Sequence, residues 1–123
     1  MAFKQCSCCR KEWATREDFL LSGELILIGY QACFENPGQG LFLFNHISEN
    51  CGTTISLEVD KFDSLYTGLR YSEVRTGQSV CTGRCLIVTN LELCGAECAL
   101  TYVREIMRII LNMKKNPIIN HIL

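Results

Sequence analysis

The apolar positions between residues 24 and 57 fall into short runs that are typical of β-strands. β-Branched and aromatic residues dominate the runs Glu24–Phe34 and Leu41–Ile47, and such residues favour the pleated, half-buried surface of a sheet. The segment between them, Asn36–Gly40 (NPGQG), consists of turn-forming residues and predicts an antiparallel hairpin. Thr53–Leu57 predicts a third strand, so we expect a three-stranded antiparallel sheet from roughly residue 24 to residue 57.

After Gly95 the apolar positions recur with the period of an α-helix. One face carries Leu100, Val103, Ile106, Met107, Ile110 and Leu111. Arg104, Arg108 and Lys115 lie on another face, and Pro117 cannot continue a helix. We therefore predict a long amphipathic helix from about residue 95 to residue 114, packed against the sheet and followed by a tail at residues 116–123.

Two shorter helices are predicted on either side of the sheet segment. Thr15 is a suitable N-cap, and Glu17 and Asp18 lie in the first turn, where the helix dipole favours negative charge. After the third strand, helical spacing is found at Val59, Phe62, Leu65 and Tyr66. Residues 68–78 are polar and are predicted to be irregular. These elements together predict an α+β fold.

The length and charge of the chain limit the classes of protein to which it could belong. It has 123 residues, which suits one domain, and a formal net charge of -1. Without an excess of Lys and Arg, general binding to nucleic acid or to a membrane surface is disfavoured. The longest apolar runs, Leu25–Ile28 and Ile106–Leu111, are far shorter than the roughly 20 residues of a membrane span. The start MAFKQCSCC lacks the apolar segment of a secretory signal, which predicts a cytoplasmic protein.

The nine cysteines of the chain indicate a specific role, because cytoplasmic proteins have no general reason to accumulate oxidisable thiols. In a reducing compartment clustered cysteines indicate metal binding more often than disulfides. Cys6-x2-Cys9 has the spacing of a knuckle, a tight turn that points two thiolates at one ion. His46-x4-Cys51, at the exit of a predicted strand, supplies two further ligands. Cys8 competes with Cys6 or Cys9 for a place in this first site.

A second set of thiols lies near the start of the predicted long helix. The pattern C-x3-C-x8-C-x3-C is formed by Cys81, Cys85, Cys94 and Cys98. Four thiolates are the ligands of a structural zinc site, and Gly83 allows the first pair to turn tightly. Two disulfides or an iron–sulfur cluster would use the same residues. Ile87, Val88 and Thr89 fit poorly into the helical hairpin that paired disulfides would need. The compact spacing does not match the cysteine runs of ferredoxins, so zinc is favoured over disulfides, over an iron–sulfur cluster and over iron.

The order of these motifs resembles a family of small bacterial proteins, rich in Cys and His, that has no assigned activity. The resemblance covers nearly the whole chain and rests on CSCC, Trp13, Phe19-Leu20, Gly29-Tyr30-Gln31, Gly40 to His46, Cys51-Gly52-Thr53-Thr54, Phe62 with Leu65-Tyr66, and the four later cysteines. It implies knuckles arranged as in a zinc ribbon on the small sheet, with clustered ligands, and no activity.

We therefore predict one metal-binding domain over residues 1–123. Its parts are a knuckle and hairpin half at residues 1–57, a four-cysteine loop with the C-terminal helix at 81–115, and the tail at 116–123. Two zinc ions would have structural roles in a non-enzymatic protein-interaction or regulatory module, whose partner contacts the C-terminal helix and tail. A thiol- or metal-based redox sensor or oxidoreductase is the alternative, and a homodimer is left open. No His-Glu-x-x-His or other catalytic motif occurs.

Overall fold

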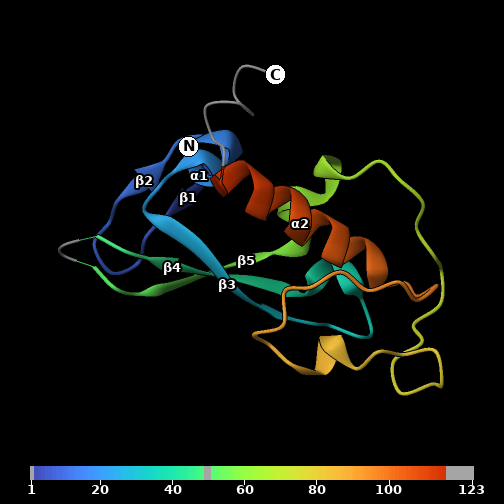
Figure 1. Cartoon of the computed structure of the whole chain (residues 1–123). Coiled ribbons are helices and arrows are strands. Elements are labelled where there is room, and N and C mark those ends of the chain that lie inside the picture. Colours follow the sequence, from blue (N-terminus) through green and yellow to red (C-terminus); the bar gives the residue numbers. More distant parts are fainter. Residues whose placement is uncertain (1, 49–50, 116–123) are drawn as a thin grey trace.

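The computed structural model describes residues 2–48 and 51–115, and it has the predicted α+β fold (Figure 1). A two-stranded hairpin and a short helix precede the three-stranded sheet, and the long helix comes last. In chain order the elements are β1 (Lys4–Gln5), β2 (Glu12–Trp13), α1 (Arg16–Leu21), β3 (Leu25–Gln31), η1 (Pro37–Gln39), β4 (Leu41–His46), β5 (Thr54–Glu58), η2 (Val59–Leu65), η3 (Arg84–Leu86) and α2 (Thr101–Lys115).

The sheet has the predicted antiparallel arrangement, in the order β3-β4-β5. Leu25 pairs with His46 at one end of the β3–β4 ladder, and Tyr30 pairs with Phe42 near the other. The register shifts between Leu27 and Gly29, which marks a β-bulge. At Gly29 a Cβ atom would lie 3.0 Å from a side-chain carbon of Val88. The missing side chain at Gly29 thus allows the segment before α2 to approach the sheet closely.

The core lies between the sheet and α2, which crosses one face of the sheet (Figure 1). Phe19 of α1 and Phe44 of β4 meet edge to face with ring centroids 4.9 Å apart, and Phe62 of η2 packs against both. The predicted apolar stripe of α2 is buried against these rings at Val103, Ile106, Met107 and Ile110. Burial of such large apolar side chains contributes roughly 1.5–3 kcal/mol each, so this layer is a major source of the stability of the fold.

The short helices also follow the sequence pattern. The hydroxyl of Thr15 accepts a hydrogen bond from the backbone N–H of Asp18 at 3.1 Å, which confirms the predicted N-cap of α1. The second predicted helix is present as the 3₁₀-helix η2. Residues 66–100 contain a single regular element, the short η3, in agreement with the irregular structure predicted for 68–78. No helix within the described residues is long and apolar enough to span a membrane.

The start of the long helix differs from the prediction, because α2 begins at Thr101 and not near residue 95. The backbone N–H of Ala99 donates to the carbonyl of Glu73 at 2.7 Å, so it is unavailable to a helix. The hydroxyl of Thr101 donates to the carbonyl of Ala96 at 2.6 Å. Cys94 and Cys98 therefore precede the helix, whereas the sequence pattern placed them on one of its faces. The predicted tail at 116–123 lies outside the described residues.

Two of the basic side chains near the C-terminus have partners inside the molecule. Arg104, which was predicted on a face other than that of the stripe, is fully buried and donates to the backbone carbonyls of Asn90 and Glu92. Lys114 donates to the carbonyl of Leu20 at the end of α1, at 3.0 Å, and burial lowers the pKa of its ammonium group to about 8. Neither side chain is free to contact nucleic acid.

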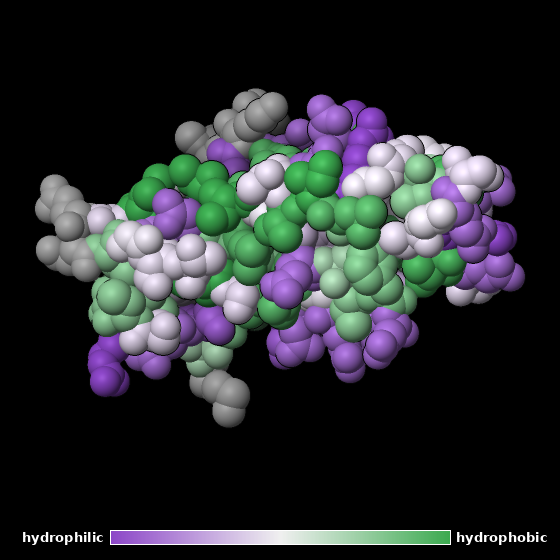
Figure 2. All heavy atoms as spheres, turned by 90° about the horizontal axis from the view of Figure 1, so that it is seen from below, coloured by the Kyte–Doolittle hydropathy of each residue, from purple (hydrophilic) through white to green (hydrophobic). Residues whose placement is uncertain are grey.

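The face of the sheet away from α2 carries exposed apolar side chains. Figure 2 shows this side of the molecule, with apolar residues gathered across its middle. Ile26 and Ile28 of β3 are 45% and 40% exposed. Leu86, at the end of η3, and Ile87, just after it, are 63% and 55% exposed. The two groups belong to segments that meet where the N–H of Tyr30 donates to the carbonyl of Val88 at 2.9 Å.

Candidate metal centre

The first two predicted ligands lie in the turn between β1 and β2. The N–H of Cys6 donates to the carbonyl of Lys11 at 2.8 Å, and the N–H of Arg10 donates to the carbonyl of Cys6 at 2.9 Å. Arg10 closes this turn in the left-handed region at a φ of 67°. The tight turn presents the thiols of Cys6 and Cys9 to the same side, as the Cys-x2-Cys spacing predicts.

The other two predicted ligands lie at the connection from β4 to β5. His46 is the last residue of β4, and its N–H donates to the carbonyl of Thr53 at 2.9 Å. Ser48 and Cys51 exchange two backbone hydrogen bonds of 3.1 Å and form an antiparallel bridge. This pairing places the thiol of Cys51 on the side of the sheet on which the His46 ring lies.

The four side chains converge on one point. Their ligand atoms all lie within 4.8 Å of one another. Cys6 Sγ is 3.7 Å from Cys51 Sγ, and Cys9 Sγ is 3.7 Å from His46 Nδ1. Zinc–sulfur bonds of about 2.3 Å in a tetrahedron place two sulfurs about 3.8 Å apart, so these separations suit one four-coordinate ion. The predicted set therefore forms a site that could hold a metal, and Cys8 is exposed outside it.

The imidazole of His46 is held from its second nitrogen by Glu24. His46 Nε2 lies 3.4 Å from a carboxylate oxygen of Glu24, while Nδ1 faces the thiols. The Trp13 ring packs edge-on against the imidazole, with centroids 5.1 Å apart. A carboxylate on the far nitrogen fixes the ring orientation and raises ligand basicity, as is usual for histidines that bind metal. Sequence reasoning missed Glu24, although its position just before the residue paired with His46 was a usable signal.

The three thiols of the site differ in acidity. Burial raises the pKa of Cys6, but hydrogen bonds from the backbone of Cys9 and Cys8 and from the His46 ring outweigh it and lower that pKa to about 6. A backbone hydrogen bond lowers the pKa of Cys51, yet burial and the neighbouring thiols together leave it raised. The pKa of Cys9 is raised in the same way. Several thiolates so close together repel one another, and a divalent cation removes that penalty.

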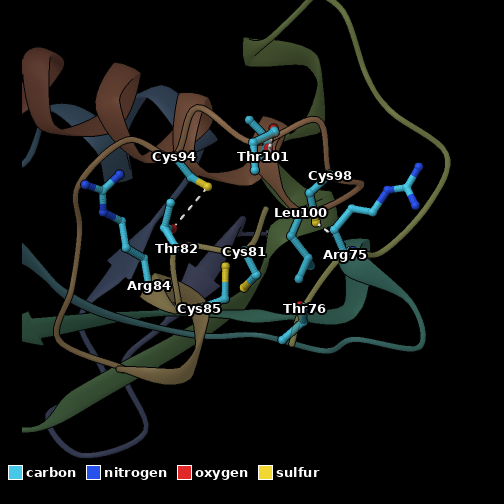
Figure 3. A pocket seen from close by; sticks show the side chains of 11 residues that line it. Arg75, Thr76, Cys81, Thr82, Arg84, Cys85, Cys94, Cys98, Leu100 and Thr101 are labelled. Carbon is cyan, nitrogen blue, oxygen red and sulfur yellow. Dashed lines mark hydrogen bonds between the residues drawn. The ribbon is translucent and has the colours of Figure 1, made fainter. Parts of the chain in front are cut away.

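The second predicted set is arranged more loosely. Cys81, Cys85, Cys94 and Cys98 line a common pocket (Figure 3). Across residues 2–48 and 51–115, however, only the first set brings three or more ligand atoms within 4.8 Å of one another. All nine cysteines are free thiols. The structure thus places the four later cysteines around one cavity without drawing their sulfurs to a single point.

Comparisons with protein-family models, with curated proteins and with solved structures give no match for this chain. The resemblance to a bacterial family rich in Cys and His therefore stays a prediction. We infer function from the geometry of the thiols and of His46.

Replacing Glu24 by Gln should lower the zinc affinity of the first site by about tenfold or more, because the carboxylate no longer orients and polarises the His46 ring. Competition with a chromophoric chelator measures this affinity. Glu35→Gln, at an exposed position, is the matched control and should bind zinc like the unchanged chain. Equal affinities for the two variants would show that Glu24 has no part in the site.

Proposed function

We propose that Cys6, Cys9, His46 and Cys51 bind one zinc ion, and that this ion has a structural role in a non-enzymatic module. The observation that carries this proposal is the complete set of four donors, which are already within 4.8 Å of one another. Catalytic zinc sites keep one coordination position open for water or substrate, whereas structural sites use four protein ligands. Four donors leave no such position here.

The donor types support zinc over other metals. Three thiolates and one imidazole form a soft set in tetrahedral spacing, which suits zinc and disfavours magnesium, calcium or manganese. Iron can bind similar donors, but three thiolates with one imidazole are a usual ligand set of structural zinc sites. His46, Cys6 and Cys51 are at least nine-tenths buried, which protects the ion from exchange with solvent.

The structural role follows from what the ion would join. The β1–β2 hairpin has only two residues in each strand, which is too short for stability of its own. Phe3 packs edge-on against Phe19 at a centroid distance of 5.7 Å, so this hairpin covers one end of the core. An ion shared by the turn of the hairpin and the β4–β5 connection would hold this cover in place.

A protein partner is part of this proposal. The predicted contact through α2 is not supported by its apolar stripe, which is buried in the core, and the predicted tail lies outside the described residues. The exposed apolar side chains of β3 and of the segment beside η3 support a contact surface on the opposite face (Figure 2). A neutral overall charge favours protein over nucleic acid as the partner.

A redox sensor remains the second candidate because Cys8 is the one exposed cysteine and directly precedes the ligand Cys9. A thiol in that position is accessible to oxidants while the ligand thiols are protected by the metal. Peroxide treatment that releases zinc from the unchanged chain but not from the Cys8→Ser variant would favour the sensor over the purely structural role.

Cobalt substitution tests the proposed structural site. In a chain carrying Cys94→Ser and Cys98→Ser, only the first set could bind Co²⁺ strongly. We expect the intense visible absorption of a tetrahedral ion with thiolate ligands, unchanged by added small anions because no position is open. Weak absorption typical of five or six ligands, or a spectrum that shifts with added anions, would contradict a closed structural site.

A further inference from the structure

The four later cysteines line one small cavity within the segment that precedes α2 (Figure 3). Cys81 and Cys85 lie around η3, Cys94 lies in the following loop, and Cys98 lies just before α2 begins. The cavity measures about 20 Å³. A cavity needs roughly 10–15 Å³ to hold one water molecule, so this space suits a single atom or ion.

The thiols in this cavity are surrounded by hydrogen-bond donors. The N–H of Gly83 donates to Cys81 Sγ at 3.3 Å, and the N–H of Arg75 donates to Cys98 Sγ at 3.2 Å. Gly83 provides its N–H from the left-handed region, at a φ of 79°. Cys94 Sγ lies 3.3 Å from the hydroxyl of Thr82 (Figure 3). Donors directed at sulfur stabilise the charged thiolate, which is the form that binds metal.

Arg104 provides the second, independent observation. Its side chain is fully buried, and its Nε and Nη2 atoms have no hydrogen-bond partner. Within the described residues it forms no ion pair with Asp or Glu. Its hydrogen bonds go to neutral oxygens of Asn90 and Glu92. A buried guanidinium keeps its charge, and a buried charge without a counter-ion is costly.

The anionic partner that Arg104 lacks would be the thiolates themselves. The backbone carbonyls of Asn90 and Glu92, which accept hydrogen bonds from Arg104, belong to the loop between Cys85 and Cys94. The guanidinium therefore lies beside the segment that carries these two thiols. A divalent ion with four thiolates carries two excess negative charges, which a buried cation beside the cluster offsets. The ionic character of Arg104 is then explained without any carboxylate.

We propose that Cys81, Cys85, Cys94 and Cys98 bind a second zinc ion as four thiolates, with Arg104 as the buried counter-charge. This second site shares no ligand with the first site, so the two proposals are independent of each other. Because residues 66–100 contain only η3 as a regular element, small backbone shifts can draw the four sulfurs around the ion. The bound ion would fasten this irregular segment to the start of α2.

Native mass spectrometry of the full chain tests this proposal by counting zinc ions. We expect two per unchanged chain, one in Cys94→Ser, and two in the control Cys33→Ser. Two ions in Cys94→Ser would overturn the second site. So would a thiol titration that finds disulfides among these cysteines, or the visible chromophore of an iron–sulfur cluster. If the proposed first site were wrong, the unchanged chain would bind one zinc ion and Cys94→Ser would bind none. This outcome differs from failure of the second site, so the two proposals are tested separately.

The role of Arg104 has its own test in the affinity of the second ion. We expect Arg104→Met to weaken binding of that ion at least tenfold, Arg104→Lys to retain most of it, and Arg108→Met, at an exposed position, to have no effect. The α2 helicity by circular dichroism shows whether each variant is folded. Unchanged affinity in a folded Arg104→Met chain would remove the counter-charge, and equal losses in the Met and Lys variants would indicate a packing role only.

Discussion

Removing the metal with a strong chelator should unfold the end of the molecule that carries the β1–β2 hairpin and should take away most of the stability of the sheet. Without the ion, the buried thiols of Cys6 and Cys51 would lie beside His46 with no bond that joins the two turns. Structural zinc contributes roughly 10–16 kcal/mol of apparent binding energy in small zinc peptides. A domain of this size is stable by about 5–15 kcal/mol in total, so loss of the ion removes a large part of that margin.

Thermal unfolding followed by circular dichroism measures the effect. A loss of about 5 kcal/mol corresponds to a decrease in Tm of roughly 20 °C for a domain of this size, and added zinc should restore the original value. Acid should act like the chelator, because protons compete with the ion for thiolates and imidazole, so stability falls as the pH falls. Metal-free, reduced protein with the same Tm would show that the metal is not structural.

The second large effect is a difference between two single substitutions. Cys51→Ser should loosen the β1–β2 hairpin and the adjoining ends of β3 and β4, because Cys6 Sγ loses its partner at 3.7 Å. Cys94→Ser should expose amides at the start of α2 and around the Ala99–Glu73 hydrogen bond, and should leave the β3–β4 ladder protected. The first ion closes a longer stretch of chain, and loop entropy alone makes it about 1 kcal/mol more stabilising.

Hydrogen exchange on both variants, read residue by residue, measures this difference. Cys33→Ser is the control for the loss of a thiol outside both sets, and its protection should match that of the unchanged chain. Identical patterns in Cys51→Ser and Cys94→Ser would mean that the two sets of cysteines are not separate sites. The same result would mean that a single cooperative unit, or no metal, holds the two ends together.

The sheet and the first site could be predicted from the sequence, because the residue patterns that define them are local. Cys6 and Cys9 share one turn, and His46 and Cys51 share another, so each pair is visible as a spacing. The hairpin turn at 36–40 fixes β3 beside β4 without long-range information. The choice among Cys6, Cys8 and Cys9 was left open, because the spacing alone does not show how the turn closed by Arg10 directs each side chain.

What the sequence could not show depends on contacts between distant segments. The β1–β2 hairpin is only two residues long on each side, below any recognisable strand pattern. Helix α2 starts late because Glu73 engages the N–H of Ala99. Arg104 lies outside the apolar stripe of α2, yet it is buried, because the irregular segment around Asn90 covers it. Irregular segments have no periodicity, so their placement on a helix leaves no trace in the pattern.

X-ray absorption at the zinc edge tests most directly whether Cys6, Cys9, His46 and Cys51 bind a zinc ion. The measurement should use the zinc-loaded chain with Cys94→Ser and Cys98→Ser, so that one site contributes to the signal. We predict three sulfur ligands at about 2.3 Å and one nitrogen at about 2.0 Å, with no oxygen ligand. A first shell rich in oxygen, or one without any sulfur, would contradict the proposed site.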